Sequence, residues 1–302
     1  FSSKFEEGDA VLLSSERVNY ALYDILAEDA IIIDAENPER LAKAVKNAVE
    51  MEHVREAHIK DGLAVTRFMK WVKDNIGKTP MDELSAGAYI DELRYKTEGN
   101  LGLSFDTICA YGEHAALPHY FATEETNVPV EPRGFLLVDS GGQYYEGTTD
   151  ITRTIAVGPL SDEEKLHFSL VLRGMLSLAN ARFPYGCRGV NLDAICREPL
   201  WSAGLDYKHG TGHGVGYLLN VHEGPNSFRW KIPDEKTDSC VLEEGMLTSD
   251  EPGLYFEGSH GIRTENLILC RKGEKNEFAQ YMYFETLTCA PIDLDAIDPE
   301  LL

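Results

Sequence analysis

The chain of 302 residues contains no apolar run that approaches the length of about 18 residues needed for a membrane-spanning helix. It is also poor in basic residues, with 28 Lys and Arg against 51 Asp and Glu and a formal net charge of −23. Nucleic acids and anionic membranes would both repel such a protein. We therefore expect a protein that binds neither a nucleic acid nor a membrane.

The six cysteines form no Cys-x-x-Cys pair and show no spacing typical of a disulfide framework. With 43% hydrophobic and 10% aromatic residues, the chain is long enough to form one large core without covalent cross-links. The cysteines are therefore expected to be reduced thiols, and reduced thiols favour a cytoplasmic location.

Four carboxylates and one imidazole lie in glycine-rich or strand-like segments, namely Asp139, Asp150, His213, Glu251 and Glu265. Asp139 ends an apolar run and Asp150 begins a β-prone segment, so both side chains should be largely buried. The interval between them has the length of a β-hairpin that presents one carboxylate on each arm. Because Glu251 and Glu265 repeat this arrangement, we interpret the sequence as two related half-sites that face each other.

Buried carboxylates in this number would repel one another unless cations neutralise them. Two divalent ions about 3.5 Å apart would do so and would also use the histidine nitrogen. Oxygen ligands with one imidazole suit Mn²⁺ best here, with Co²⁺ or Zn²⁺ as alternatives. Each carboxylate taken alone could be a turn residue, a cap or a surface charge, and a degenerate relative that keeps only the scaffold is the alternative for the whole set.

The order of these five residues, in segments such as Val138-Asp-Ser-Gly and Glu251-Pro-Gly, resembles the pita-bread metallopeptidases, the family of methionine aminopeptidase, prolidase and aminopeptidase P. The resemblance extends over most of the chain. Within the family it is strongest to the cytosolic eukaryotic type of aminopeptidase P, because of the segments Gly102–Ile108, Leu219–Pro225 and Phe284–Thr288.

This resemblance implies an α+β pita-bread fold, in which two pseudo-symmetric halves, each of two helices and a hairpin, surround a curved antiparallel sheet. The sequence predicts four helices, over Met51–Ile76, from Thr79-Pro80 to Gly99, from Ser161 to Phe183, and from Asn191 to Gly204. Their order agrees with two copies of this unit. Residues 45–302 would form the catalytic domain, and residues 1–44 would be the C-terminal end of a preceding creatinase-like domain. Relatives often form dimers, so a homodimer is expected.

The resemblance also assigns roles to the five ligands. Asp139 and Asp150 would bind one metal ion, His213 and Glu251 the other, and Glu265 would bridge the two together with one of the aspartates. A hydroxide held between the metals would attack the scissile carbonyl. Glu251 would act as general acid and base, passing the proton of this hydroxide to the leaving amine.

Three further histidines, His119, His209 and His222, match histidines that line the active site of the family and could bind the peptide carbonyl or the oxyanion. His119 and His222 would contact the substrate, and apolar groups such as Tyr217 and Leu218 would help to form the proline pocket. For His209, a role as a second histidine ligand of the metal is an alternative.

Two residues are interpreted as hydrogen-bonding partners of the carboxylates, Arg263 and Tyr255, and Tyr255 would also contact the substrate. Arg153 is expected to hold Asp150 in the same way. For all three, the alternative is an ordinary surface interaction.

These roles imply a dinuclear metalloaminopeptidase that hydrolyses the N-terminal Xaa-Pro bond of peptides with proline at the second position. A prolidase, which cleaves only Xaa-Pro dipeptides, would share all five ligands and is an open alternative. A non-catalytic binding module of the same fold is the third, although the presence of every ligand argues against it.

Overall fold

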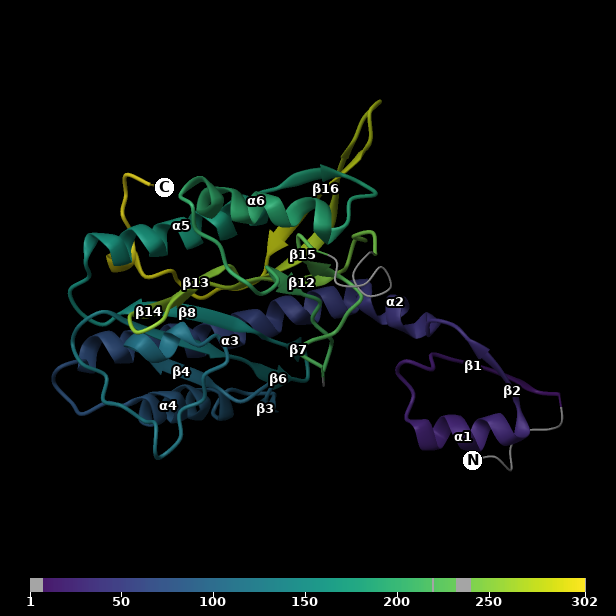
Figure 1. Cartoon of the computed structure of the whole chain (residues 1–302), viewed down its shortest axis with the longest axis horizontal. Helices are drawn as coiled ribbons and strands as arrows, with labels where there is room; N and C mark the ends of the chain where they lie inside the picture. The colour runs from purple at the N-terminus through teal and green to yellow at the C-terminus, as the bar shows by residue number, and fades with distance from the viewer. Residues whose placement is uncertain (1–7, 219, 232–239, 302) are drawn as a thin grey trace. The chain divides into compact units, whose positions relative to one another are not determined.

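The computed structural model describes residues 8–218, 220–231 and 240–301. The chain separates into two compact units, Phe1–Lys43 and Ala44–Leu302. In the small unit, two parallel strands are joined by one helix, with a second helix following: β1 (Ala10–Leu13), α1 (Tyr20–Asp29), β2 (Ile31–Asp34) and α2 (Pro38–Ala44) (Figure 1).

In the large unit the same order of elements occurs twice. Helices α3 (Ala48–Asn75) and α4 (Glu83–Tyr95) precede the first set of strands, and α5 (Asp162–Ala179) and α6 (Gly189–Ser202) precede most of the second. In Figure 1 the strands β8, β12, β13 and β14 lie between α3 and α4 on one side and α5 and α6 on the other. Every strand pair described in this unit is antiparallel, so the predicted α+β architecture is confirmed.

The strands and short helices have the following bounds. The first half contains β3 (Asn100–Leu103), β4 (Ile108–Tyr111), the 3-10 helix η2 (Gly112–Ala116), β5 (Phe135–Ser140), β6 (Gly142–Tyr144), β7 (Gly147–Thr148) and β8 (Ile151–Ala156). The second contains β9 (Arg182–Pro184), β10 (Gly212–His213), β11 (Ser227–Phe228), β12 (Leu247–Asp250), β13 (Gly253–Phe256), β14 (His260–Arg263), β15 (Asn266–Lys275), β16 (Gln280–Thr286) and the 3-10 helix η3 (Leu294–Ala296).

Each half contains one hairpin nested inside another. In the first half β5 pairs with β8, and the chain between them forms the short β6–β7 hairpin. In the second half β12 pairs with β15 around the β13–β14 hairpin. Asp139 lies near the end of β5 and Asp150 directly before β8, while Glu251 directly follows β12 and Glu265 directly precedes β15. The repeated carboxylate arrangement predicted from the sequence is therefore present in both halves.

The helix boundaries show where the local sequence signals are sufficient. Ser161 caps α5 in a capping box with Glu164, as predicted. α4 instead begins after Asp82, whose side chain accepts a hydrogen bond from the backbone of Ser85, so the prediction of a start at Thr79-Pro80 is wrong. The predicted ends are also too late, because α4 ends at Tyr95, α5 at Ala179 and α6 at Ser202. α6 begins two residues before Asn191, because the Asn191 side chain accepts a hydrogen bond from the backbone of Arg188.

The helices bury apolar side chains against the strands. In the first half Phe68 and Ile90 of the helices pack in one cluster with Leu136 of β5. In the second half Leu178 and Leu192 pack in another with Ile268 of β15. None of the six cysteines forms a disulfide. Within the described residues, none of the helices has the combination of length and apolar character that crossing a membrane would require.

Candidate metal centre and substrate pocket

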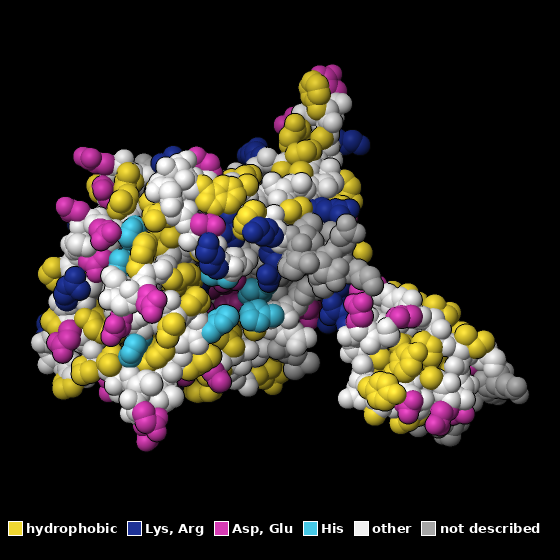
Figure 2. Space-filling view, in the orientation of Figure 1, with side chains coloured by type: hydrophobic (Ala, Val, Ile, Leu, Met, Phe, Trp, Pro, Cys, Tyr) yellow, Lys and Arg dark blue, Asp and Glu magenta, His cyan; other side chains and the backbone are white. Residues whose placement is uncertain are grey.

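Ten of the side chains predicted for the site line one pocket of about 710 Å³ in the large unit. Figure 2 shows histidine side chains around a hollow in this face, with acidic side chains inside it. The ten residues are His119, Asp139, Asp150, His209, His213, His222, Glu251, Tyr255, Arg263 and Glu265. The fold thus brings together groups from both halves of the large unit.

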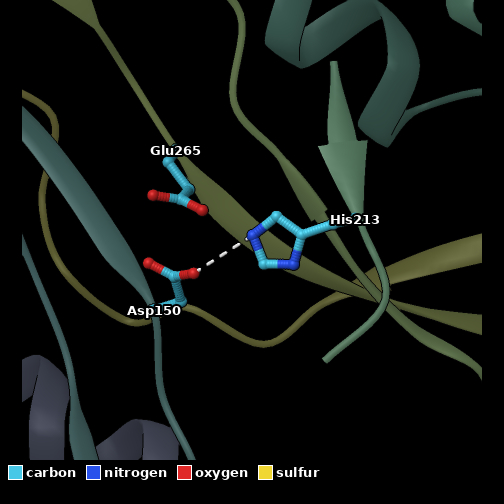
Figure 3. Close-up of side chains that lie close together, drawn as sticks. All are labelled: Asp150, His213 and Glu265. Atoms are coloured by element: carbon cyan, nitrogen blue, oxygen red, sulfur yellow. Dashed lines mark ion pairs between the residues drawn. The ribbon is translucent and has the colours of Figure 1, made fainter. Parts of the chain in front are cut away.

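Asp150, His213 and Glu265 form the tightest group, because one ligand atom of each lies within 4.8 Å of the others (Figure 3). The Nε2 atom of His213 is 3.4 Å from Asp150 Oδ2 and 3.4 Å from Glu251 Oε1. Asp139 accepts a hydrogen bond at Oδ2, whereas its Oδ1 is buried with no hydrogen-bond partner among the described residues. A carboxylate oxygen that binds a metal ion needs no hydrogen bond from the protein. A buried carboxylate oxygen without a protein partner is therefore typical of a metal ligand.

The electrostatics of the group favour positive ions. Burial, followed by repulsion from neighbouring carboxylates, raises the pKa of Asp150 and Glu265, and raises that of Glu251 to about 7. Burial opposes the charged form of His213, yet Asp150 and Glu251 together raise its pKa to about 9. Without cations, these carboxylates would therefore tend to bind protons. Divalent cations could neutralise the carboxylates instead, so this set of donor atoms fits two metal ions.

Hydroxyl and backbone groups orient three of these side chains. The Thr152 hydroxyl donates to Glu265 Oε2 at 2.7 Å, and the Ser249 hydroxyl donates to Glu251 Oε1 at 2.9 Å. The Nδ1–H of His213 donates to a backbone carbonyl at 3.0 Å, which leaves Nε2 available to a metal. Thr152 and Ser249 were not predicted, although Thr152 lies on the same strand face as Asp150, two residues away.

Arg263 connects the acidic group to the histidines. Its Nη2 donates to Asp139 Oδ2 at 2.6 Å and its Nη1 donates to the Tyr255 hydroxyl at 2.9 Å. The Tyr255 oxygen is also 2.9 Å from His209 Nε2. Arg263 therefore bonds a carboxylate of the group directly, whereas the partners of the Tyr255 hydroxyl are Arg263 and His209 rather than a carboxylate.

His209 is neutral and has both ring nitrogens engaged. Its Nδ1 donates to the carbonyl of Gly210 at 2.7 Å, so Nε2 accepts the hydrogen bond of Tyr255. Burial lowers the pKa of His209 to about 4. Because neither nitrogen is available, this geometry argues against the alternative in which His209 is a second histidine ligand. Partial burial and the neighbouring His213 also lower the pKa of His222.

Arg153 does not hold Asp150, and this prediction is wrong. Side chains alternate between the two faces of a strand, so residues three positions apart point to opposite sides. The five N–H groups of Arg153 donate instead to neutral oxygens at 2.5 to 2.9 Å, namely the carbonyls of Thr152, Glu265, Ala290 and Pro291 and the side chain of Asn266. Burial lowers the pKa of Arg153 to about 10, which leaves it charged at neutral pH.

The apolar wall of the pocket comes from other residues than predicted. Tyr217 and Leu218 are not among its lining residues, and the Tyr217 hydroxyl donates to the backbone carbonyl of Tyr145 instead. Leu219, which belongs to the same sequence motif, lies outside the described residues. The apolar lining consists of Phe105, Ile108, Pro118 and Phe121, and Arg229 also lines the pocket. Phe105 and Ile108 belong to the segment Gly102–Ile108, whose sequence resemblance was the available signal.

Comparison with known proteins identifies the class to which this fold and site belong. The profile of metallopeptidase family M24 matches residues 52–272, and the chain belongs to this family. The chain is 41% identical over 304 residues to a probable Xaa-Pro aminopeptidase P of Tuber melanosporum, covering 99% of this chain and 49% of the relative. It is 39% identical over 306 residues to one of Pyrenophora tritici-repentis, covering 100% of this chain and 51% of that relative. The chain thus spans about half the length of the curated relatives it matches.

Solved structures agree with this assignment. An X-prolyl aminopeptidase from Caenorhabditis elegans, described as a cytosolic enzyme with a di-nuclear active site, is 38% identical with a TM-score of 0.87, covering 97% of this chain and 47% of that chain. A Xaa-Pro dipeptidase from Bacillus anthracis is 29% identical with a TM-score of 0.77, covering 95% of this chain and 74% of that chain. The predicted pita-bread fold is confirmed by these similarities.

Proposed function

We propose that this chain is the catalytic part of a dinuclear-metal aminopeptidase that removes the N-terminal residue from peptides with proline at the second position. The observation that supports this most is that the five proposed metal ligands meet three further histidines and an apolar wall in one pocket. The similarity to Xaa-Pro aminopeptidases over nearly the whole chain points to the same activity.

The protein groups have distinct parts in the proposed reaction. Asp139, Asp150, His213, Glu251 and Glu265 would hold two divalent cations, for which we propose Mn²⁺ as the native ion. When bound, such ions supply an activated water and polarise the scissile carbonyl. Glu251 would take up the proton of this water and transfer it to the leaving amine, a role that an ionisable carboxylate inside the pocket can fill.

Substrate contacts would come from the remaining polar groups of the pocket. Neutral His209 lies beside Tyr255, and His119 and His222 line the same pocket, so these side chains could hydrogen-bond the peptide carbonyl and the developing oxyanion. The proline ring has no amide hydrogen and needs an apolar surface, which Phe105, Ile108 and Phe121 could provide.

Hydrolysis of two peptides by the Mn²⁺-loaded protein would test the proposal. Release of arginine from Arg-Pro-Pro is expected, with Co²⁺ and Zn²⁺ compared in parallel. Rapid cleavage of the dipeptide Arg-Pro without cleavage of the tripeptide would show that the protein is a prolidase. Failure to bind two equivalents of Mn²⁺ in a metal titration, together with no turnover, would instead indicate a non-catalytic binding module.

The small unit and the assembly are further subjects of proposal. Parallel sheets are usually covered on both faces, yet Leu12, Ile31 and Ile33 of the β1–β2 pair are 46%, 60% and 47% exposed. These exposed apolar residues support the proposal that residues 1–44 are the end of a creatinase-like domain. We also propose a cytoplasmic homodimer, whose mass light scattering coupled to gel filtration would measure.

A further inference from the structure

Glu83 is a buried carboxylate that organises a long segment of the first half. It is the first residue of α4, and its side chain is 0% exposed. Oε1 accepts hydrogen bonds from the backbone N–H of Tyr111 at 2.8 Å and from His114 Nδ1 at 2.9 Å. Oε2 accepts from the Tyr120 hydroxyl at 2.9 Å and from the backbone N–H of Val128 at 3.3 Å. All four donors belong to the segment 111–128, which we call the His119 segment.

The His119 segment forms one wall of the pocket. Three of its residues line the pocket, Pro118, His119 and Phe121, and the last two stand on either side of Tyr120 in the sequence. Tyr120 is buried and its ring stacks on that of His114, with 4.4 Å between the ring centroids. Because the residue between His119 and Phe121 is held at both its ring and its hydroxyl, its neighbours have little freedom to move.

The other side of the His119 segment rests on the second half of the fold. Arg263 Nη2 donates to the carbonyl of Pro118 at 3.3 Å. A Cβ atom at Gly261 would overlap the carbonyl oxygen of Ala115, so η2 lies directly on the backbone of β14. The segment is therefore fixed between Glu83 on one side and β14 on the other.

We propose that Glu83 is a positioning residue that fixes His119 in the pocket through Tyr120. The proposal rests on the proposed function, in which His119 meets the peptide substrate. A carboxylate suits this place because it only accepts hydrogen bonds, and all four groups that surround it donate. In Glu83→Gln, an N–H₂ group would replace one carboxylate oxygen and would face groups that also donate. The His119 segment would therefore have to shift.

Double-mutant cycles with His119→Ala test the proposal, one with Glu83→Gln and one with the milder Tyr120→Phe. Each is expected to lower kcat/KM for Arg-Pro-Pro by about tenfold, the scale of one lost hydrogen bond to a charged group, while two equivalents of Mn²⁺ still bind. In the His119→Ala background the same changes are expected to alter kcat/KM by less than about twofold, because residues that act through one another are not additive.

Asp293→Asn is the matched control. Asp293 is also a buried carboxylate that accepts a backbone N–H, from Ala156 at 2.8 Å, and pairs with Lys73 at 2.6 Å, but it does not line the pocket. Its effect on kcat/KM should be the same in the wild-type and His119→Ala backgrounds. If Glu83→Gln and Tyr120→Phe are additive with His119→Ala in the same way, the positioning role is refuted.

A spectroscopic measurement separates this proposal from the proposed function. The ring ¹³C–¹H resonance of His119, assigned by its loss in His119→Ala, is expected to shift in Tyr120→Phe and Glu83→Gln but not in Asp293→Asn. If the wild type does not hydrolyse Arg-Pro-Pro, the proposed function fails, and the shift of the His119 resonance alone decides whether Glu83 positions His119. If Glu83→Gln does not fold, Tyr120→Phe is the deciding variant, and an unchanged His119 resonance in that variant refutes the positioning role.

Discussion

Arg153→Lys is expected to destabilise the protein by several kcal/mol although it conserves the charge. Arg153 is buried and donates all five of its N–H groups to neutral oxygens on β8, on β15 and its preceding residue, and on the C-terminal residues Ala290 and Pro291. A lysine carries only three donors on one atom, so at least two of these five hydrogen bonds are lost. Each lost hydrogen bond to this charged group costs about 1 to 3 kcal/mol, which gives a loss of about 2 to 6 kcal/mol.

The measurement is urea unfolding of the metal-free protein, followed by circular dichroism. Arg271→Lys is the control. Arg271 pairs with two acidic side chains rather than with neutral oxygens and is 27% exposed, so its replacement should cost less than about 1 kcal/mol. If Arg153→Lys lowered the free energy of unfolding no more than Arg271→Lys does, the view that Arg153 ties the two halves together through neutral acceptors would be refuted.

Four further outcomes are expected. Glu251→Gln should nearly abolish turnover of Arg-Pro-Pro while circular dichroism shows a folded protein, and near-normal activity would exclude Glu251 as the proton-transfer group. Mn²⁺ should raise the unfolding temperature of wild type in a thermal-shift assay but raise it much less in Asp150→Asn, since only the folded state assembles the site; equal shifts would exclude Asp150 as a ligand. Gly261→Ala should lower the unfolding temperature by several degrees, because its Cβ would overlap the Ala115 carbonyl; an unchanged temperature would contradict that close approach. The folded-state pKa of His209, about 4, lies below the unfolded value of 6.5. The metal-free wild type should therefore lose stability relative to His209→Gln as pH falls from 6.5 to 4, by about 3 kcal/mol at most. If urea unfolding gave the same pH dependence of stability for both proteins, His209 would not be buried in the neutral form.

The sequence predicted the acidic centre well because its signals are local. Asp139 and Asp150 stand at the ends of strands with glycine-rich turns between them, and strand periodicity together with turn composition is enough to place such residues. The same holds for Ser161, whose capping box is complete within four residues. Local spacing also caused an error, because the nearness of Arg153 to Asp150 in sequence hid their positions on opposite strand faces.

Residues that act over long separations could not be found in this way. Glu83 is an ordinary acidic residue in the first turn of a helix, and its partners lie 28 to 45 residues further along the chain. The assignment of Tyr217 and Leu218 to the proline pocket failed for a related reason, since which side of a loop faces a cavity depends on tertiary packing. Arg229 was missed because nothing in its immediate neighbours distinguishes it from a surface residue, and Phe121 was missed although it stands two residues after His119.

The nested hairpins also bear on how relatives of this protein can vary. The four acidic residues of the candidate metal centre stand where each outer strand pair ends, whereas the tips of the inner hairpins lie well away from that point in the sequence, near Tyr145 and Gly258. Insertions or deletions at those tips would change how many residues separate the two acids of a pair without displacing either of them. Fixed intervals between acidic residues are therefore a poor guide for recognising distant homologues, and the strand pairs that flank the acids are a better one.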